Sequence, residues 1–167
     1  IKGIIGMTFL DQRRLGVKKE TMRFSPLSPV LLPSMQITAK TPFGNLGLPM
    51  SLVSRMSKLT NDPTALKIML KDGTSAGNFM SVKFLDSYMN YKPKYDLSSF
   101  SQCPVLLNQP AEDRWTPIEL SQPVLDRLNV PHQVVMLPHG GHYPVEAEAL
   151  EQLKQSSIAF IEQYTAQ

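Results

Sequence analysis

Three stretches of the chain have the hydrophobic pattern of short buried strands: residues 3–10, 105–108 and 133–137. Each is rich in apolar residues and is bounded by polar, charged or turn-prone residues. A strand inside a parallel sheet is covered on both faces, so its sequence is a continuous apolar run rather than an alternation of apolar and polar residues. Helical patterns follow the second and third stretches. The pattern predicts an α/β fold with about three parallel strands flanked by helices.

The two helices of the C-terminal region have different sequence signals. Thr116-Pro117-Ile118-Glu119 matches a capping box, which predicts a helix that begins there, kinks at Pro123 and ends near Asn129. The last helix is expected over about 145–164. Its expected inward positions are Leu150, Leu153, Ser157, Phe160, Ile161 and Tyr164.

Between the first two strands lies a long segment with a different character. Five of the fourteen prolines fall within residues 26–49, which argues against a long helix or a central strand there. Helical periodicity then returns over about 50–59, from Asp62-Pro63 onward, and over about 78–90. We therefore predict three parts: a first core strand (1–11), a helical lid (12–100) and a C-terminal core (101–167).

Asp113 and His142 are the strongest candidates for chemistry. Each follows a short strand, lies in a polar loop and precedes a helix, and the two are 29 positions apart. That spacing accommodates one helix and one returning strand, so the two loops can lie at adjacent strand ends of one parallel sheet. A buried carboxylate beside an imidazole is the Asp-His half of a Ser-His-Asp site.

At these residues the sequence resembles the α/β-hydrolase family, in particular its lidded esterase, lysophospholipase and serine-aminopeptidase branch. The resemblance lies in Asp113 followed by Thr116-Pro117 and a helix, and in a strand that leads to Gly141-His142 and a last helix. It covers the C-terminal part of that family's pattern. It implies Asp113 as the acid, His142 as the base, and a serine upstream on a sharp strand-to-helix turn.

The serine is the part of this pattern that the chain does not clearly provide. Gly73-Thr74-Ser75-Ala76-Gly77 matches G-x-S-x-G in form, but it follows a helical pattern instead of a buried strand. Gly73 fits a helix C-terminus, with Ser75 or Asn78 as the cap of the next helix. Ser34, Ser51, Ser54 and Ser81 lack a comparable context. We expect the nucleophile upstream of this chain, with Ser75 as the alternative inside it.

The acid and the base also have rivals. Glu112 precedes Asp113 and would point elsewhere if Asp113 points inward, while Asp11 follows the first strand. His139 fits a supporting loop position, and His132 fits the surface.

Length and composition indicate which classes of protein and partner remain possible for this chain. The 167 residues fall about a hundred short of a complete α/β hydrolase, which predicts a C-terminal fragment that is inactive alone. The 17 basic and 14 acidic residues give a net charge of +3, which does not suggest a nucleic-acid partner. The single cysteine, Cys103, fits a buried position and a cytoplasmic protein. There is no apolar run of membrane-spanning length.

Seven of the nine methionines lie between residues 22 and 89, where they could line a pocket for apolar groups. The expected substrate is a small-molecule ester, or an amide or N-terminal peptide bond. The rival hypothesis is a non-catalytic module that binds an apolar ligand under the lid. No cofactor or metal is expected from the motifs. The unpaired sheet edge predicts a homodimer or association with the missing N-terminal half.

Overall fold

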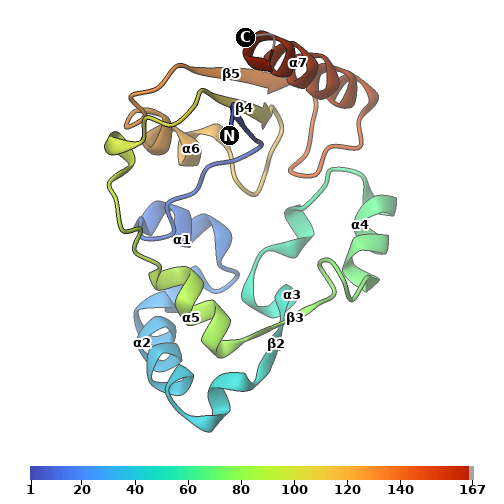
Figure 1. Ribbon diagram of the computed structural model, residues 1–167. Helices are drawn as coiled ribbons and strands as arrows, with labels where there is room; N and C mark the ends of the chain where they lie inside the picture. Colours follow the sequence, from blue (N-terminus) through green and yellow to red (C-terminus); the bar gives the residue numbers. More distant parts are fainter. Residues whose placement is uncertain (166–167) are drawn as a thin grey trace.

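A computed structural model describes residues 1–165, and its core is a parallel sheet of three strands (Figure 1). The strands are β1 (Ile4–Gly6), β4 (Val105–Pro110) and β5 (His132–Leu137), in the spatial order β1-β4-β5. Ile4 aligns with Val105, and Val105 aligns with His132 on the other side. The predicted α/β class with three parallel strands is confirmed.

The central strand β4 is buried along its whole length, as its apolar pattern predicts. Leu106 and Leu107 are 0% exposed, and the polar Asn108 and Gln109 are also fully buried. Gln109 donates to the backbone carbonyl of Thr116 at 3.2 Å, and Asn108 accepts from Ser156 of the last helix at 2.8 Å. These bonds satisfy the Gln109 amide nitrogen and the Asn108 amide oxygen, whereas Gln109 Oε1 has no donor among the described residues.

The first strand is shorter than predicted, because the chain leaves the sheet after Gly6. The backbone N–H of Phe9 donates to the hydroxyl of Ser121 at 3.1 Å, and this bond draws residues 7–11 toward the helix that follows β4. Only Ile4–Gly6 therefore pairs with β4. The expected strand over 3–10 was wrong in its length.

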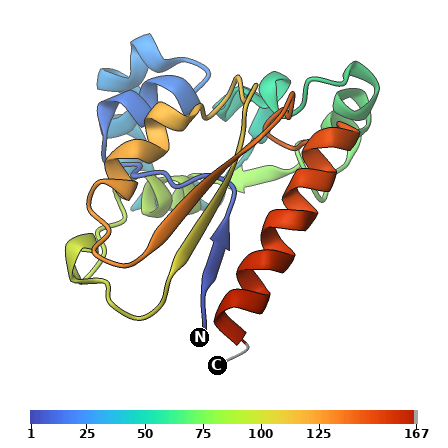
Figure 2. The same ribbon diagram turned by 90° about the horizontal axis from the view of Figure 1, so that it is seen from above.

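Two helices flank the sheet on opposite faces, α6 (Ile118–Leu125) and α7 (Ala147–Thr165) (Figure 2). Pro123 lies inside α6 as predicted, but the helix ends at Leu125, before the expected Asn129. The expected capping box is absent from α6, whose cap position is Pro117 without a side-chain bond. The Thr116 side chain is instead bonded to Asp113 and His142.

The last helix buries less than its sequence predicts. Phe160 is 3% exposed, but Leu150 and Ile161 are 45% and 50% exposed. They share a helix face with the exposed Ile158. Since α7 packs against β4 and β5 through its other side, this face has no protein layer over it in the described part of the chain. The expectation that Leu150 and Ile161 point inward was wrong.

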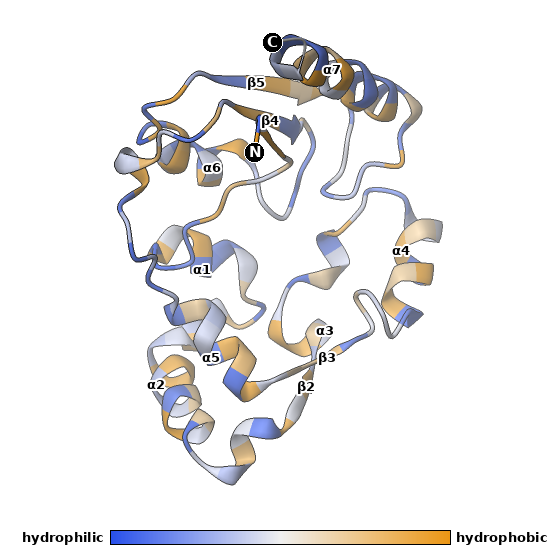
Figure 3. Cartoon of the chain, in the orientation of Figure 1, coloured by the Kyte–Doolittle hydropathy of each residue, from blue (hydrophilic) through white to orange (hydrophobic). Residues whose placement is uncertain are grey.

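The middle segment, residues 12–100, is mostly helical, and hydrophobic positions are spread over its helices (Figure 3). Its longer helices are α1 (Leu15–Thr21), α2 (Ser28–Ala39), α4 (Pro63–Lys71) and α5 (Val82–Asn90). The shorter elements are η1 (Ser25–Leu27), η2 (Pro42–Asn45), β2 (Gly47–Pro49), α3 (Met50–Val53), η3 (Met56–Lys58), β3 (Phe79–Ser81) and η4 (Leu97–Ser99). Strands β2 and β3 form a separate antiparallel pair.

Helix α2 runs for 12 residues within the stretch 26–49, where the prolines argued against a long helix. Pro29 lies in its first turn, where a missing N–H costs no intrahelical bond, and only Pro33 lies inside the helix. The helix packs against α5. One proline at the helix start and one inside it are therefore compatible with a helix of 12 residues.

Two other helix boundaries in the middle segment were also wrong. The expected helix over 50–59 is interrupted at Ser54, whose hydroxyl donates to the carbonyl of Thr21 at 2.6 Å and whose backbone bridges Met22. The helix expected from 78 begins at Val82, because residues 79–81 are paired in β3. Ser81, rather than Ser75 or Asn78, caps it. The Asp62 cap of α4 was predicted correctly.

Candidate active site

The loops that follow β4 and β5 bring Asp113 and His142 into direct contact. Their strands are adjacent and parallel, so both loops leave the same edge of the sheet. The loops are joined by backbone bonds from Ala111 to Leu137 and from Glu112 to Gly140. His142 Nδ1 lies 2.8 Å from Asp113 Oδ2. The sequence therefore predicted this contact correctly.

The Asp113 carboxylate is fully buried and accepts four hydrogen bonds. Oδ1 accepts from the backbone N–H groups of Trp115 and Thr116, and Oδ2 accepts from the Thr116 hydroxyl and from His142. Burial raises the pKa of this carboxyl, but the bonds from His142 and Thr116 outweigh it, so the pKa lies below its ordinary value. The carboxylate thus stays ionised, and its stabilising contribution is lost only as the pH falls through that lowered pKa.

Thr116 is a member of this site that sequence reasoning missed. Its Oγ1 lies 2.9 Å from Asp113 Oδ2 and 2.9 Å from His142 Nδ1. The Thr116 hydroxyl donates its hydrogen to Asp113, so its oxygen can accept from His142. An imidazole with its proton on Nδ1 can therefore donate toward both the Thr116 oxygen and the Asp113 carboxylate. Nε2 of that tautomer is the free basic nitrogen. The sequence Thr116-Pro117, which we interpreted as a helix cap, was the feature from which a role for Thr116 in the site could have been inferred.

The His142 ring is held between two aromatic side chains. Its centroid lies 4.6 Å from that of Trp115 and 5.2 Å from that of Tyr143, both in edge-to-face geometry. Trp115 also packs against the small core of Met56, Leu59 and Ala76 in the middle segment. The ring is therefore fixed from both sides, with 14% of the His142 side chain exposed.

Gly141 allows the histidine loop to approach the middle segment closely. A Cβ atom at Gly141 would lie 2.8 Å from the backbone nitrogen of Asn61, a distance that no side chain could accept without a shift of backbone. Beside it, the N–H of Tyr143 donates to the carbonyl of Leu59 at 2.7 Å. The glycine thus positions His142 where the sheet edge meets the middle segment.

The rival acids and histidines occupy other positions. Asp11 forms a two-pronged ion pair with Arg13, with both contacts at 2.7 Å. His132 is an exposed residue of β5. His139, which adopts a left-handed backbone with φ of 58°, donates through Nδ1 to Glu112 at 3.1 Å. Glu112 therefore points away from the Asp113 carboxylate, as predicted.

The exposed His139–Glu112 pair provides a pH-dependent signal that can be measured. The hydrogen bond to Glu112 raises the pKa of His139, and the charge of Glu148 adds to it. The resulting stabilisation is present at low pH and is lost as the pH rises through that raised pKa. We expect Glu112→Gln to lower the midpoint of the His139 ring-proton titration in NMR spectra. Glu151→Gln, on a helix position that contacts Lys154, is the control, and an unchanged midpoint in Glu112→Gln would refute the pairing.

Ser75 does not have the backbone context of a nucleophile elbow. It lies in a turn between α4 and β3, where its N–H donates to the carbonyl of Asp72 and its own carbonyl accepts from Asn78. The preceding element is a helix, not a buried strand. Within residues 1–165, no hydroxyl is hydrogen-bonded to His142 Nε2.

An apolar cavity of about 360 Å³ opens beside His142. The loops after β4 and β5 form its sheet-edge side through Trp115, Thr116, His142 and Tyr143. Thr8 and Leu10, from the segment after β1, and side chains of the middle segment form the rest. Five methionines are among the lining residues: Met22, Met50, Met56, Met80 and Met89. Flexible thioether side chains adapt to varied apolar shapes, so this cavity suits a hydrocarbon group next to the imidazole.

Two further properties concern only the part of the chain that the structure describes. No helix there combines the length and the apolar character needed to cross a membrane. That part also contains no group of three or more His, Cys, Asp or Glu side chains arranged to hold a metal ion.

Searches with protein-family models and against curated proteins found no match. Solved structures do match. A monoacylglycerol lipase of Paleococcus ferrophilus superposes with a TM-score of 0.65 at 17% identity, over 98% of this chain and 60% of that one. The chain has the α/β-hydrolase fold.

Two other solved structures agree with this fold assignment. An α/β hydrolase of a Penicillium species has a TM-score of 0.58 at 14% identity, over 100% of this chain and 57% of that one. A thermophilic esterase of Thermogutta terrifontis has a TM-score of 0.55 at 17% identity, over 98% of this chain and 56% of that one. The chain thus spans between 56% and 60% of these α/β-hydrolase structures.

Proposed function

We propose that this chain provides the acid and the base of a serine-dependent hydrolase that cleaves carboxylic esters with an apolar acyl group. The observation that carries the proposal is the buried Asp113 carboxylate bonded to His142 Nδ1 at 2.8 Å, with His142 lining an apolar cavity. The solved structures with the same fold include a lipase and an esterase, which supports a hydrolase.

In the proposed reaction a serine oxygen attacks the ester carbonyl carbon while its proton passes to His142 Nε2. Asp113 stabilises the imidazolium and keeps the other ring proton on Nδ1. The imidazolium then donates its proton to the departing alcohol. A water molecule next attacks the acyl-serine while His142 takes one of its protons. The imidazolium returns that proton to the serine oxygen as the bond to the acyl carbon breaks and the carboxylic acid leaves.

We further propose that the serine comes from polypeptide outside these 167 residues. Two observations support this. No hydroxyl contacts His142 Nε2 within residues 1–165, and strand β1 has an unpaired edge where Ile4 and Ile5 are 37% and 40% exposed. A neighbouring strand that ends in the nucleophile turn would cover this edge. In that arrangement the middle segment serves as the lid.

The test is ester hydrolysis by a longer product of the same gene that includes the upstream segment. We expect His142→Ala to reduce turnover of p-nitrophenyl esters to the background rate. Ser75→Ala, the matched control, is expected to retain it. A fully active His142→Ala variant would refute the proposed base, and an inactive but folded Ser75→Ala variant would refute the external serine.

A second candidate function is a non-catalytic module that holds an apolar ligand. The methionine-lined cavity, beside a histidine whose Nε2 has no hydroxyl partner within the described residues, favours it. Tight binding of a fatty acid, together with no hydrolysis by the longer product, would support this alternative.

A further inference from the structure

Strand β5 is an edge strand of the sheet, on the side away from β1 (Figure 2). No strand in the described part of the chain pairs with its outer edge. The carbonyl groups of Pro131 and Leu137 accept hydrogen bonds from N–H groups of β4 and of the residue that follows it. Because the direction of backbone groups alternates along a strand, the N–H and C=O groups of His132, Val134 and Met136 point outward. This edge therefore offers a row of donors and acceptors that another strand can bind.

The side chains of two of these outward residues, Val134 and Met136, form an apolar stripe on one face of β5. Gln133, the residue before Val134, donates to Gln163 of α7 at 3.3 Å. Since neighbouring side chains of a strand point to opposite faces, Val134 and Met136 lie on the face away from α7. They are 43% and 45% exposed. The stripe and the free edge thus lie side by side.

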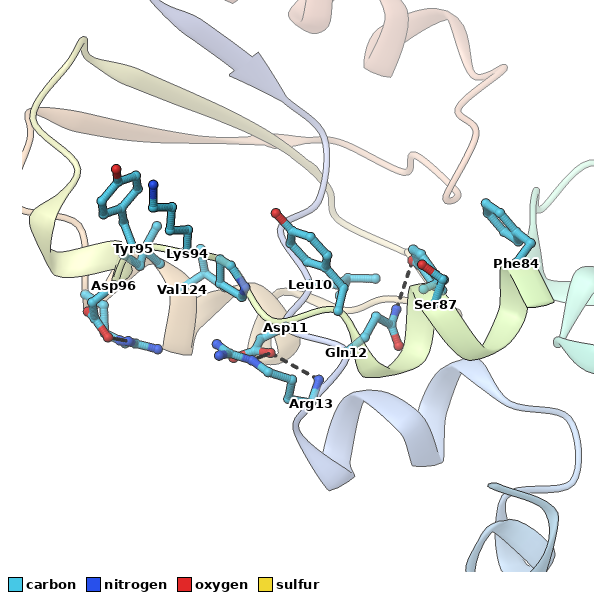
Figure 4. A pocket seen from close by; sticks show the side chains of 15 residues that line it. Leu10, Asp11, Gln12, Arg13, Phe84, Ser87, Lys94, Tyr95, Asp96 and Val124 are labelled. Carbon is cyan, nitrogen blue, oxygen red and sulfur yellow. Dashed lines mark hydrogen bonds and ion pairs between the residues drawn. The ribbon is translucent and has the colours of Figure 1, made fainter. Parts of the chain in front are cut away.

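Helix α6 lies on this face of the sheet, but it packs toward the segment after β1. Ser121 of α6 accepts from the N–H of Phe9 at 3.1 Å, and Val124 lines a cavity of about 620 Å³ together with Leu10 (Figure 4). These contacts draw α6 toward β1. The stripe on β5 is therefore left half-exposed.

Strand β5 also lacks the features that usually prevent an edge strand from pairing with another copy. The segment His132–Leu137 contains no Lys, Arg, Asp, Glu or Pro. Its register with β4 runs without interruption, so no bulge bends the edge. The β-branched residues Val134 and Val135 occupy its centre, where they favour strand pairing. The edge is therefore open to a further strand along its whole length.

We propose that β5 pairs antiparallel with β5 of a second copy of this chain, about a twofold axis at Val134. In this register Val134 faces Val134 of the second copy, and His132 faces its Met136. Every outward N–H and C=O group of the three residues then meets an outward group of the other strand. The two sheets join into one continuous sheet across both copies.

A second copy fits this edge because no like charges oppose each other in the pairing. The opposed side chains are Val134 with Val134, His132 with Met136, and Gln133 with Val135. On the α7 face, Gln163 adds a neutral amide beside Gln133. An acidic or basic strand would find no opposite charge along β5. The upstream strand proposed above belongs beside β1, at the other edge, so the two partners do not compete.

Cysteine cross-linking of the 167-residue chain tests the register. At the axis the two Cα atoms of position 134 lie about 5.5 Å apart, within the range of a disulfide. The two Cα atoms of position 136 are offset by four residues, roughly 14 Å, which is beyond it. In a Cys103→Ala background, oxidation with diamide should convert Val134→Cys to a covalent dimer. Met136→Cys, the control with the same face and the same exposure, should stay at 18.7 kDa.

Analytical ultracentrifugation tests the same contact without a cross-link. Val134→Lys places two like charges opposite each other at the axis, so we expect it to raise the dissociation constant of the dimer about tenfold. Val30→Lys, at a 71% exposed position of α2, is the control and should leave it unchanged. Circular dichroism establishes that each variant is folded.

Three results would overturn the proposal. The first is a monomeric mass for the unsubstituted chain at every concentration, and the second is equal cross-linking of Val134→Cys and Met136→Cys. The third is undiminished dimerisation of folded Val134→Lys, which would place the contact at another surface, such as the β1 edge. None of these results affects the His142→Ala turnover test, so the two proposals fail separately.

Discussion

Replacing Asp113 by asparagine is expected to lower kcat for ester hydrolysis about ten-thousand-fold in the longer, serine-containing product. The side chain keeps its shape, and its oxygen can still accept from the N–H groups of Trp115 and Thr116. Its amide nitrogen then faces His142 Nδ1. That nitrogen donates, so Nδ1 must accept, and the ring proton moves to Nε2. A protonated Nε2 cannot take the proton of a serine.

The measurement is kcat and KM with a p-nitrophenyl ester, and Asp11→Asn is the control. Asp11 is paired with Arg13 and makes no bond to His142, so its variant should retain turnover. Because Asp113 acts through the imidazole rather than on the substrate, KM should change little in Asp113→Asn. Turnover of Asp113→Asn within tenfold of the unsubstituted enzyme would contradict the role assigned to the carboxylate.

The largest expected loss of stability comes from Leu107→Ala. Leu107 is 0% exposed in the central strand, where it aligns with Gly6 of β1 and Val134 of β5. Truncation removes buried methyl groups and leaves a cavity between two layers, at a cost of about 2–5 kcal/mol in the free energy of unfolding. Urea unfolding followed by circular dichroism measures it.

Leu15→Ala is the matched control, because Leu15 is 81% exposed at the start of α1. Its effect should stay within about 0.5 kcal/mol. If Leu107→Ala and Leu15→Ala had equal unfolding midpoints, β4 would not be the buried centre of the sheet.

The sheet and the Asp113–His142 contact could be predicted because both follow from patterns local to the chain. An apolar run such as Val105-Leu106-Leu107 can be stable only where both strand faces are covered. Two loops that follow adjacent parallel strands leave the same edge, so the order of elements alone places the acid near the base. Asp62-Pro63 identified a helix start for the same reason, since capping depends on neighbouring residues.

The errors arise where a distant segment decides the local structure. Ser54 interrupts a helical pattern because it pairs with Thr21 and Met22, over thirty residues earlier. Residues 79–81 form a strand because 47–49 is available as a partner. Thr116 matched a helix cap, but the buried Asp113 and His142 offered its hydroxyl stronger partners. None of these long-range partners can be read from the residues around the position itself.

The exposed apolar face of α7 has a similar explanation. Periodicity correctly identifies the helix and Phe160 as an inward residue, but it also assigns Leu150 and Ile161 to a covered surface. Hydrophobicity shows that a residue favours burial, but it does not show which element covers that residue.

The most direct test of the central claim is intact-mass spectrometry before and after treatment with a fluorophosphonate, which labels activated serines. The account predicts that the 18.7 kDa chain alone stays unlabelled. It also predicts that a longer product of the same gene gains one adduct, on a serine outside these 167 residues, and loses it in the His142→Ala variant. A single adduct on the 18.7 kDa chain, located at Ser75, would contradict the account and place the nucleophile inside the chain.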